Sequence, residues 1–114
     1  MKSLRIVNLE RGLPSREEAY RLLDNALLSA RKDGILAVKL IHGYGSSGKG
    51  GILRFAVRSY LRQRKELGQI TIFIAGESWS QFEDYSKQLL HRVPETLLDV
   101  DLGRGNKGIT LVLL

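Results

Sequence analysis

Residues 36–42, LAVKLIH, form a nearly apolar run, and residues 43–51, GYGSSGKGG, follow it with five glycines and one lysine. An apolar run of this length predicts a strand that is covered on both faces. Glycines directly after a strand let the backbone turn tightly and approach a ligand closely. Several unrelated folds hold a phosphate at such a place, so this stretch is the first candidate for a functional site.

Outward from this stretch, strand and helix patterns alternate along the chain. Strands are predicted over 4–9, 35–42, 69–76 and 109–114, and helices after Ser15, over 51–66 and over 78–93. Ser15 and Glu18 have the spacing of a capping box. Strands separated by helices predict an α/β fold, here a two-layer sandwich with a mixed or mostly parallel sheet of four strands. Ligand sites in such sheets lie at the carboxyl ends of strands, where His42 and the glycines fall.

Composition limits the classes of protein that fit. The 114 residues suit one domain over 1–114, and the lack of cysteine excludes disulfides, thiolate catalysis and cysteine-bound metals. Two distant histidines argue against a structural zinc site. We expect no cofactor, although a divalent metal stays open. With neither a signal peptide nor a membrane-spanning run, we expect a cytoplasmic protein without a membrane partner.

Positive charge is concentrated just after the glycines. The net charge is +6 and the pI about 9.9, and residues 49–75 alone carry six basic groups and one acidic group. Arg54, Arg58 and Arg62 recur every four residues and should line one helix face, where like charges repel one another. An anion lying over that face would relieve the repulsion. The pattern favours a nucleic-acid partner, DNA or RNA.

Three phosphate-binding patterns compete for the glycine stretch. Gly43, Gly48 and Lys49 match the nucleoside-triphosphate loop, but Gly50 stands where that loop needs a hydroxyl for magnesium. Gly43, Gly45 and Gly48 match the dinucleotide pattern GxGxxG, which is weak alone and here follows the second strand instead of the first. The third pattern is His42-Gly43-Tyr44-Gly45 itself.

That third pattern carries a resemblance to a known family. IHGYGSSGKGGILRFAVRSYL resembles the HGxG signature of the Smr (small MutS-related) domain, and the ending LGRGNKGITLVLL resembles the family's glycine-rich loop and final strand. The opening strand and SREEA helix stand where the family has LDLHG and an EA-containing helix. Two features depart from the family: Asn8 and Glu10 replace an acid and a histidine, and the connection over 77–102 is long. The resemblance implies a stand-alone member.

The resemblance implies DNA nicking or RNA cleavage, DNA repair, or binding to branched DNA or stalled ribosomes. His42 would then be the catalytic acid or base, with Glu10 as a substitute base or metal ligand. For nucleic-acid binding, we predict contacts from the glycine loops and the basic helix, namely Gly43, Tyr44, Gly45, Ser46, Ser47, Gly48, Lys49, Arg54, Arg58, Arg62, Arg104 and Lys107.

The main hypothesis is a nucleic-acid-binding domain that binds the phosphate backbone. The first alternative is an endonuclease that uses His42, and the second is a module whose basic face meets a ribosomal surface or another protein. Trp79 and Phe82 are aromatic candidates for stacking on bases, but we expect both to cover the sheet instead. The sequence leaves open the choice between DNA and RNA and the oligomeric state.

Overall fold

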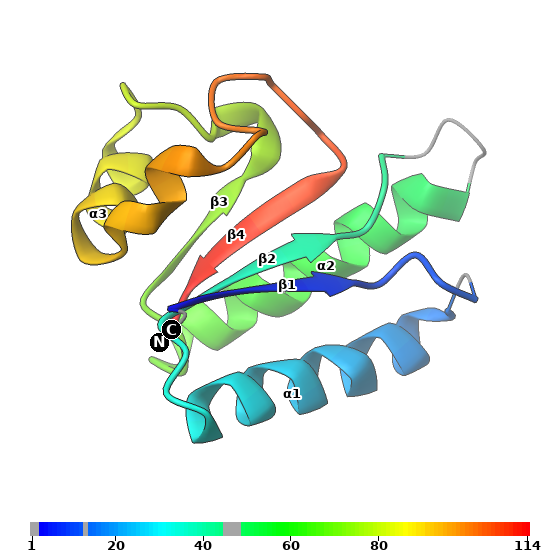
Figure 1. The fold of residues 1–114 in the computed structure, drawn as a ribbon. Coiled ribbons are helices and arrows are strands. Elements are labelled where there is room, and N and C mark those ends of the chain that lie inside the picture. Colours follow the sequence, from blue (N-terminus) through cyan, green and yellow to red (C-terminus); the bar gives the residue numbers. More distant parts are fainter. Residues whose placement is uncertain (1–2, 13, 45–48) are drawn as a thin grey trace.

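A computed structural model describes residues 3–12, 14–44 and 49–114 of the chain. Its elements follow one another as β1 (Leu4–Asn8), α1 (Arg16–Lys32), β2 (Ala37–Ile41), α2 (Lys49–Glu66), β3 (Ile72–Ala75), η1 (Gly76–Ser78), α3 (Asp84–Arg92), η2 (Pro94–Leu98) and β4 (Ile109–Leu113). The alternation of strands and helices predicted from the sequence is confirmed (Figure 1). No helix in these ranges is long and apolar enough to cross a membrane.

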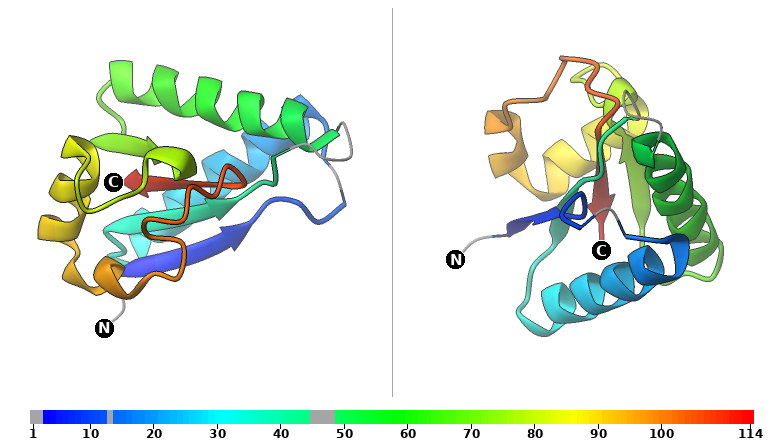
Figure 2. Two further views of the ribbon diagram at one scale, coloured as in Figure 1. Left: turned by 90° about the horizontal axis from the view of Figure 1, so that it is seen from above. Right: turned by 90° about the vertical axis from the view of Figure 1, so that its right-hand side faces the viewer.

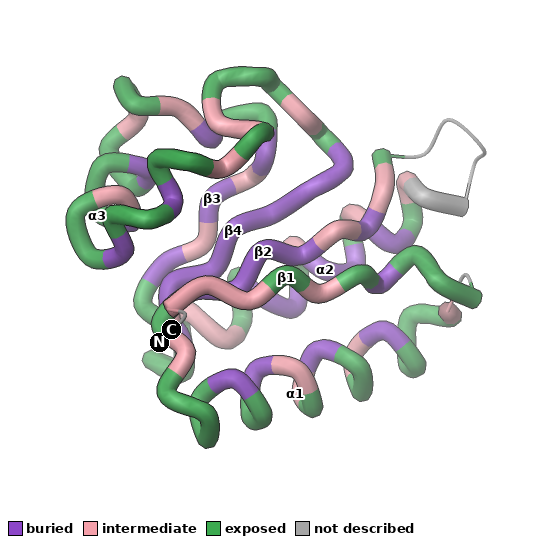
Figure 3. The backbone as a smooth tube through the Cα atoms, viewed as in Figure 1, coloured by how far each residue is buried: buried purple, intermediate pink, exposed green. Residues whose placement is uncertain are grey.

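The four strands form one mixed sheet in the order β1-β2-β4-β3. β1 pairs with β2 in parallel, and β4 pairs with both β2 and β3 in the antiparallel direction. β1, β2 and β3 therefore all point the same way, and β4 is inserted between β2 and β3. All five residues of β4 are buried, as expected for a central strand with both faces covered (Figure 3).

α1 begins as its sequence predicts. The Ser15 hydroxyl accepts a hydrogen bond from the backbone N–H of Glu18, and the Glu18 carboxylate accepts one from the N–H of Ser15, each at 3.2 Å. This capping box satisfies two amides that the first turn leaves without helical partners. Four apolar positions at helical spacing then face the sheet, namely Ala19, Leu23, Leu27 and Ala30.

α1 and α2 lie side by side against one face of the sheet (Figure 2). Their apolar stripes and the side chains of β1, β2 and β4 on that face form the larger of two buried clusters. α2 contributes Leu53, Val57, Tyr60 and Leu61, spaced so that all four point inward. Helices and sheet together form the two layers that the sequence predicts.

The other face of the sheet carries a smaller cover of α3, η1 and η2. Trp79 is buried at its centre, as expected, whereas Phe82 is 88% exposed and does not cover the sheet. α3 begins at Asp84, later than predicted, because the Glu83 carboxylate accepts hydrogen bonds from the backbone N–H groups of Tyr85 and Ser86. Residues 78–83 therefore precede α3 and do not form its first turns.

Candidate functional site

Two glycine-containing turns meet at one end of the sheet. The backbone N–H groups of His42 and Gly43, which follow β2, both donate to the carbonyl of Gly108, which precedes β4, at 2.9 and 3.0 Å. Gly43 has a φ of +76°, a conformation that side chains disfavour. We call residues 42–44 and 103–108 the rim, because together they form the edge of the domain where β2 ends and β4 begins.

His42 lies inside the rim, fully buried. Its Nδ1 is 2.7 Å from the carbonyl of Gly43, and its Nε2 is 2.9 Å from the hydroxyl of Thr110. A carbonyl can only accept, so Nδ1 carries the proton and Nε2 accepts from Thr110, which in turn accepts from Nε of Arg58 at 3.3 Å. Both ring nitrogens are therefore used within the protein.

The surroundings of His42 keep the ring neutral. Burial lowers the pKa of His42 to about 4, and the positive charges of Arg58 and Arg54 act in the same direction, against the opposing hydrogen bond to Gly43. The catalytic role predicted for His42 stays a prediction. As it lies, His42 connects the turn after β2 to β4.

Arg58 is also engaged within the protein, in contrast to the expected contact with a polyanion. Its guanidinium pairs with both carboxylate oxygens of Glu77, at 2.9 and 2.7 Å, and donates to the carbonyls of Lys107 and Ile109. Its side chain is only 14% exposed. Burial opposes ionisation of Glu77, but the hydrogen bonds from Arg58 prevail and lower the pKa of that carboxyl. Arg58 thus fastens α2 to the rim.

The other predicted cations lie in different surroundings. Arg54 is half-buried on α2, with its guanidinium 5.1 Å from the ring centre of Phe55 and its Nε without a hydrogen-bond partner among the described residues. Arg62, Arg104 and Lys107 are exposed. Within the described parts of the chain, neither Arg104 nor Lys107 forms an ion pair. The rim therefore presents two cations to solvent.

A buried polar cluster, which the sequence did not predict, supports the rim from below. Lys39 on β2 has a side chain only 4% exposed, and its Nζ donates to Asp99 at 2.7 Å and to Asp101 at 2.6 Å. Trp79 Nε1 donates to Asp99, and Asn106 Nδ2 donates to Asp101, each at 3.0 Å. We call these five residues the anchor cluster. It fastens the loop over 99–106 to the centre of the sheet.

The charges within the anchor cluster stabilise one another. Burial alone would lower the pKa of Lys39, but the hydrogen bonds to Asp101 and Asp99 outweigh it, so that its pKa is raised and the amine stays charged. The same hydrogen bond from Lys39 lowers the pKa of Asp101. Lys39 and Asp101 therefore each favour the charged form of the other.

The remaining predicted residues are placed only in part. Glu10 is exposed beside the rim, and a Cβ built at Gly43 would lie 3.3 Å from its Oε2. Gly45, Ser46, Ser47 and Gly48 lie outside the described residues, and of Lys49 the structure gives only its place at the start of α2. Among the described residues, no group of three or more His, Asp or Glu side chains could hold a metal ion.

Two cavities accompany these features. One, of about 350 Å³, is part of the rim and is lined by Tyr44, Arg104, Gly105, Asn106 and Lys107.

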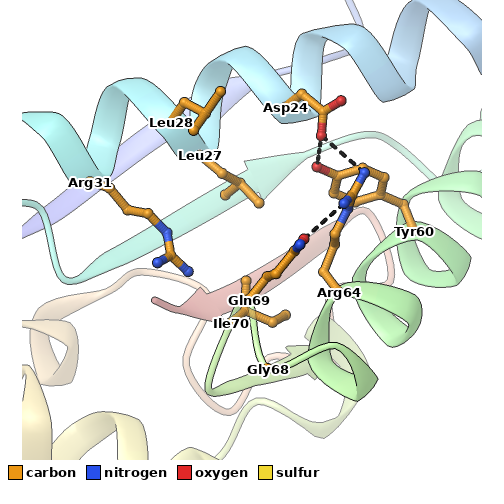
Figure 4. Close-up of a pocket in the computed structure, with 9 residues that line it drawn as sticks. All are labelled: Asp24, Leu27, Leu28, Arg31, Tyr60, Arg64, Gly68, Gln69 and Ile70. Carbon is orange, nitrogen blue, oxygen red and sulfur yellow. Dashed lines mark hydrogen bonds and ion pairs between the residues drawn. The ribbon is translucent and has the colours of Figure 1, made fainter.

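The other cavity, of about 480 Å³, lies between α1 and α2 near the residues that precede β3. In this groove Arg64 contacts Asp24 at 3.3 Å and Gln69 at 2.8 Å, and its guanidinium lies 4.7 Å from the ring centre of Tyr60 (Figure 4).

Comparison with known proteins agrees with the fold. A model of the Smr domain matches residues 11–76, more than half of the chain. Among solved structures, the chain is similar to the crystal structure of the Smr domain of Thermus thermophilus MutS2, with 27% sequence identity, a TM-score of 0.58 and 96% of each chain covered. No curated protein sequence matches the chain.

The mixed sheet, its helical layer and the loop-built rim define a small α/β domain of the MutS-related class. The family model covers α1, β2, α2 and β3, together with the turn at His42 and Gly43 after β2, which we call the HG turn. The structural match extends over nearly the whole chain. The chain belongs to the Smr domain family, as its HGxG stretch predicts. This membership supports a domain of the nucleic-acid-binding or endonuclease type.

Proposed function

We propose that this Smr domain binds the sugar–phosphate backbone of DNA or RNA at the rim. One observation carries the proposal: two turns far apart in the sequence meet at Gly108, and the second brings Arg104 and Lys107 to the surface. Cations held on a short glycine-rich loop can approach a phosphate without interference from bulky neighbours. The positive excess of residues 49–75 adds a favourable field along α2.

The buried groups of the site give the rim its shape. Arg58 and the anchor cluster hold the loop over 99–108, and His42 connects the HG turn to Gly108 through its backbone N–H and to Thr110 on β4 through its ring. Arg104 and Lys107 are then the primary phosphate contacts, with Arg62 and Arg54 as contacts further along α2. A preformed site loses less conformational entropy when it binds, because its loops are already ordered.

Fluorescence anisotropy with labelled DNA and RNA tests this proposal. Affinity should fall steeply between about 50 and 200 mM salt, with log K linear in log[salt], because each phosphate contact releases counterion. R104A/K107A should lower the slope by about 2, since each lost contact lowers it by about 1. The matched control is R31A/K32A, which removes two exposed charges from the far end of α1. Salt-insensitive binding, or equal losses in both variants, would count against the rim.

Strand cleavage at the same rim is the second candidate function, favoured by the position of Glu10. Its exposed carboxylate lies beside Gly43, where it can reach a bound backbone, whereas His42 is enclosed. A nicking or RNA-cleavage assay with Mg²⁺ and with EDTA tests this candidate and its metal requirement. E10Q should abolish cleavage and keep binding. Cleavage by E10Q at the rate of the unmodified protein would exclude Glu10 as the base.

A ribosomal or protein partner for the same surface stays a prediction. Pull-downs with and without nuclease treatment separate direct protein contact from bridging by RNA. A partner that survives nuclease treatment and is lost from R104A/K107A would place a protein surface at the rim.

A further inference from the structure

Tyr44 lies in the rim, directly after the HG turn, with 57% of its surface exposed. We propose that its ring stacks on an unpaired nucleobase, so that the ligand of the rim is single-stranded nucleic acid or a single-stranded segment of a larger one. This inference rests on the proposed backbone contact and adds to it a subsite for the base.

The ring of Tyr44 packs against the backbone at Gly108 on one side and faces a cavity on another. A Cβ built at Gly108 would lie 3.3 Å from Cδ1 of Tyr44 and 3.4 Å from Cα of Gly43, so the absence of a side chain at 108 lets the ring lie close to the backbone. The ring also lines the 350 Å³ cavity together with residues 104–107. That volume falls in the range of small-molecule sites, which is enough for one base.

The polar groups around this cavity suit a base flanked by phosphates. Arg104 and Lys107 line the same cavity and are exposed, so they can neutralise the phosphates on either side of a stacked base. An aromatic face beside cations is the combination by which proteins bind single strands. In a duplex each base is stacked on its neighbours and offers only its edges in the grooves, so a ring face requires an unstacked base.

The same cavity has little means of reading base identity. Asn106, its one amide side chain, donates to Asp101 at 3.0 Å and accepts from the backbone N–H of Gly108 at 2.8 Å. Because the amide nitrogen and oxygen of Asn106 are both engaged within the protein, this side chain holds Gly108 beneath Tyr44 instead of contacting a base edge. The subsite should therefore prefer unpaired over paired bases and tolerate any sequence.

The test compares two oligonucleotides of equal length and charge, a labelled dT 12-mer and an abasic 12-mer, by fluorescence anisotropy at fixed salt. Stacking on one aromatic ring contributes about 1–3 kcal/mol per base, so the dT 12-mer should bind the unmodified protein about 5- to 150-fold more tightly than the abasic one. Y44L should lower affinity for dT to the abasic level and leave abasic binding unchanged. Y44F, which keeps the ring, should bind dT like the unmodified protein.

The outcomes separate this inference from the proposed function. Equal affinity of the unmodified protein for both oligonucleotides, with a steep salt dependence, would overturn base stacking and leave the backbone contact in place. Base stacking is also overturned if Y44L weakens binding of both oligonucleotides equally. Absence of salt-dependent binding to either would overturn the proposed function itself, and the inference with it. Circular dichroism of Y44L checks that the fold is retained, as expected for an exposed side chain.

Discussion

The rim and the groove between α1 and α2 both combine arginine, tyrosine and an amide side chain, but they differ in how their cations are paired. In the groove, Arg64 is matched by Asp24, Gln69 and the ring of Tyr60 (Figure 4). At the rim, Arg104 and Lys107 have no acidic partner among the described residues, and the ion pairs lie beneath them, around Lys39 and Arg58. Arg31, which also lines the groove, is exposed and forms no ion pair among the described residues. The rim differs because two such cations lie on one short loop.

The largest effect should come from removing the positive charge at the base of the rim. K39M leaves the carboxylates of Asp99 and Asp101, whose side chains are 5% and 21% exposed, without their cation, and breaking a buried ion pair costs about 3–5 kcal/mol. Chemical denaturation measures the loss, and R104A/K107A, which changes only exposed charges, should stay within about 0.5 kcal/mol of the unmodified protein. K39M/D99N/D101N should recover part of the loss. A K39M effect below about 1 kcal/mol would show that the anchor cluster does not hold the loop.

The second-largest effect should be a dependence of stability on pH, which arises from His42 in the rim. The pKa of His42 is about 4 in the folded protein against 6.5 in the unfolded chain, so between these pH values the unfolded state binds the extra proton. The free energy of unfolding should therefore fall as pH falls from 6.5 towards 4, by about 3 kcal/mol in all. Carboxyl groups of model peptides have pKa values of about 4, so the upper half of the window reports His42.

Denaturation curves at about pH 7, 6 and 5 measure this dependence. H42N, which cannot take up the proton, should lose the slope between pH 6.5 and about 5. H91Q, a matched change at an exposed histidine on α3, should keep it. A slope that survives in H42N would mean that another group carries the proton linkage.

The smallest effect should come from the groove. The Tyr60 hydroxyl donates to the half-exposed carboxylate of Asp24, and burial together with this hydrogen bond raises the pKa of the phenol. Y60F removes one hydrogen bond and keeps the ring, so it should cost about 1 kcal/mol of stability. Nucleic-acid affinity should not change, because the groove residues are distinct from those of the rim. Loss of affinity in Y60F would break the division between the two regions.

Local patterns predicted most of the fold. The capping box at Ser15 and the covered strand that becomes β2 depend on neighbours in the sequence, and both are confirmed. The position of the HG turn at the end of β2 followed from the same patterns. Lys39 also stands out in the sequence, because it is a lysine within an apolar run. Its partners Asp99 and Asp101 lie about 60 positions away, and no periodicity connects them to it.

The candidate site was predicted less completely for the same physical reason. Regular spacing placed Arg54, Arg58 and Arg62 on one helix face, yet which of them meets an acid depends on where the chain after β3 brings Glu77. The glycine pattern predicted a close approach of backbone to a ligand, and the structure uses Gly43 and Gly108 to bring two protein segments together. The burial of His42 depends on its contact with Thr110, which lies on the neighbouring strand β4.

The position of β4 has a consequence for synthesis on the ribosome. β4 comes last among the strands along the chain, yet it lies between β2 and β3 and joins them. A nascent chain that has exposed everything up to residue 108 therefore has two disconnected sheet fragments, and we expect cooperative folding to wait until Leu113 has left the exit tunnel. Until then the backbone N–H and C=O groups of β2 and β3 that pair with β4 stay open to other chains.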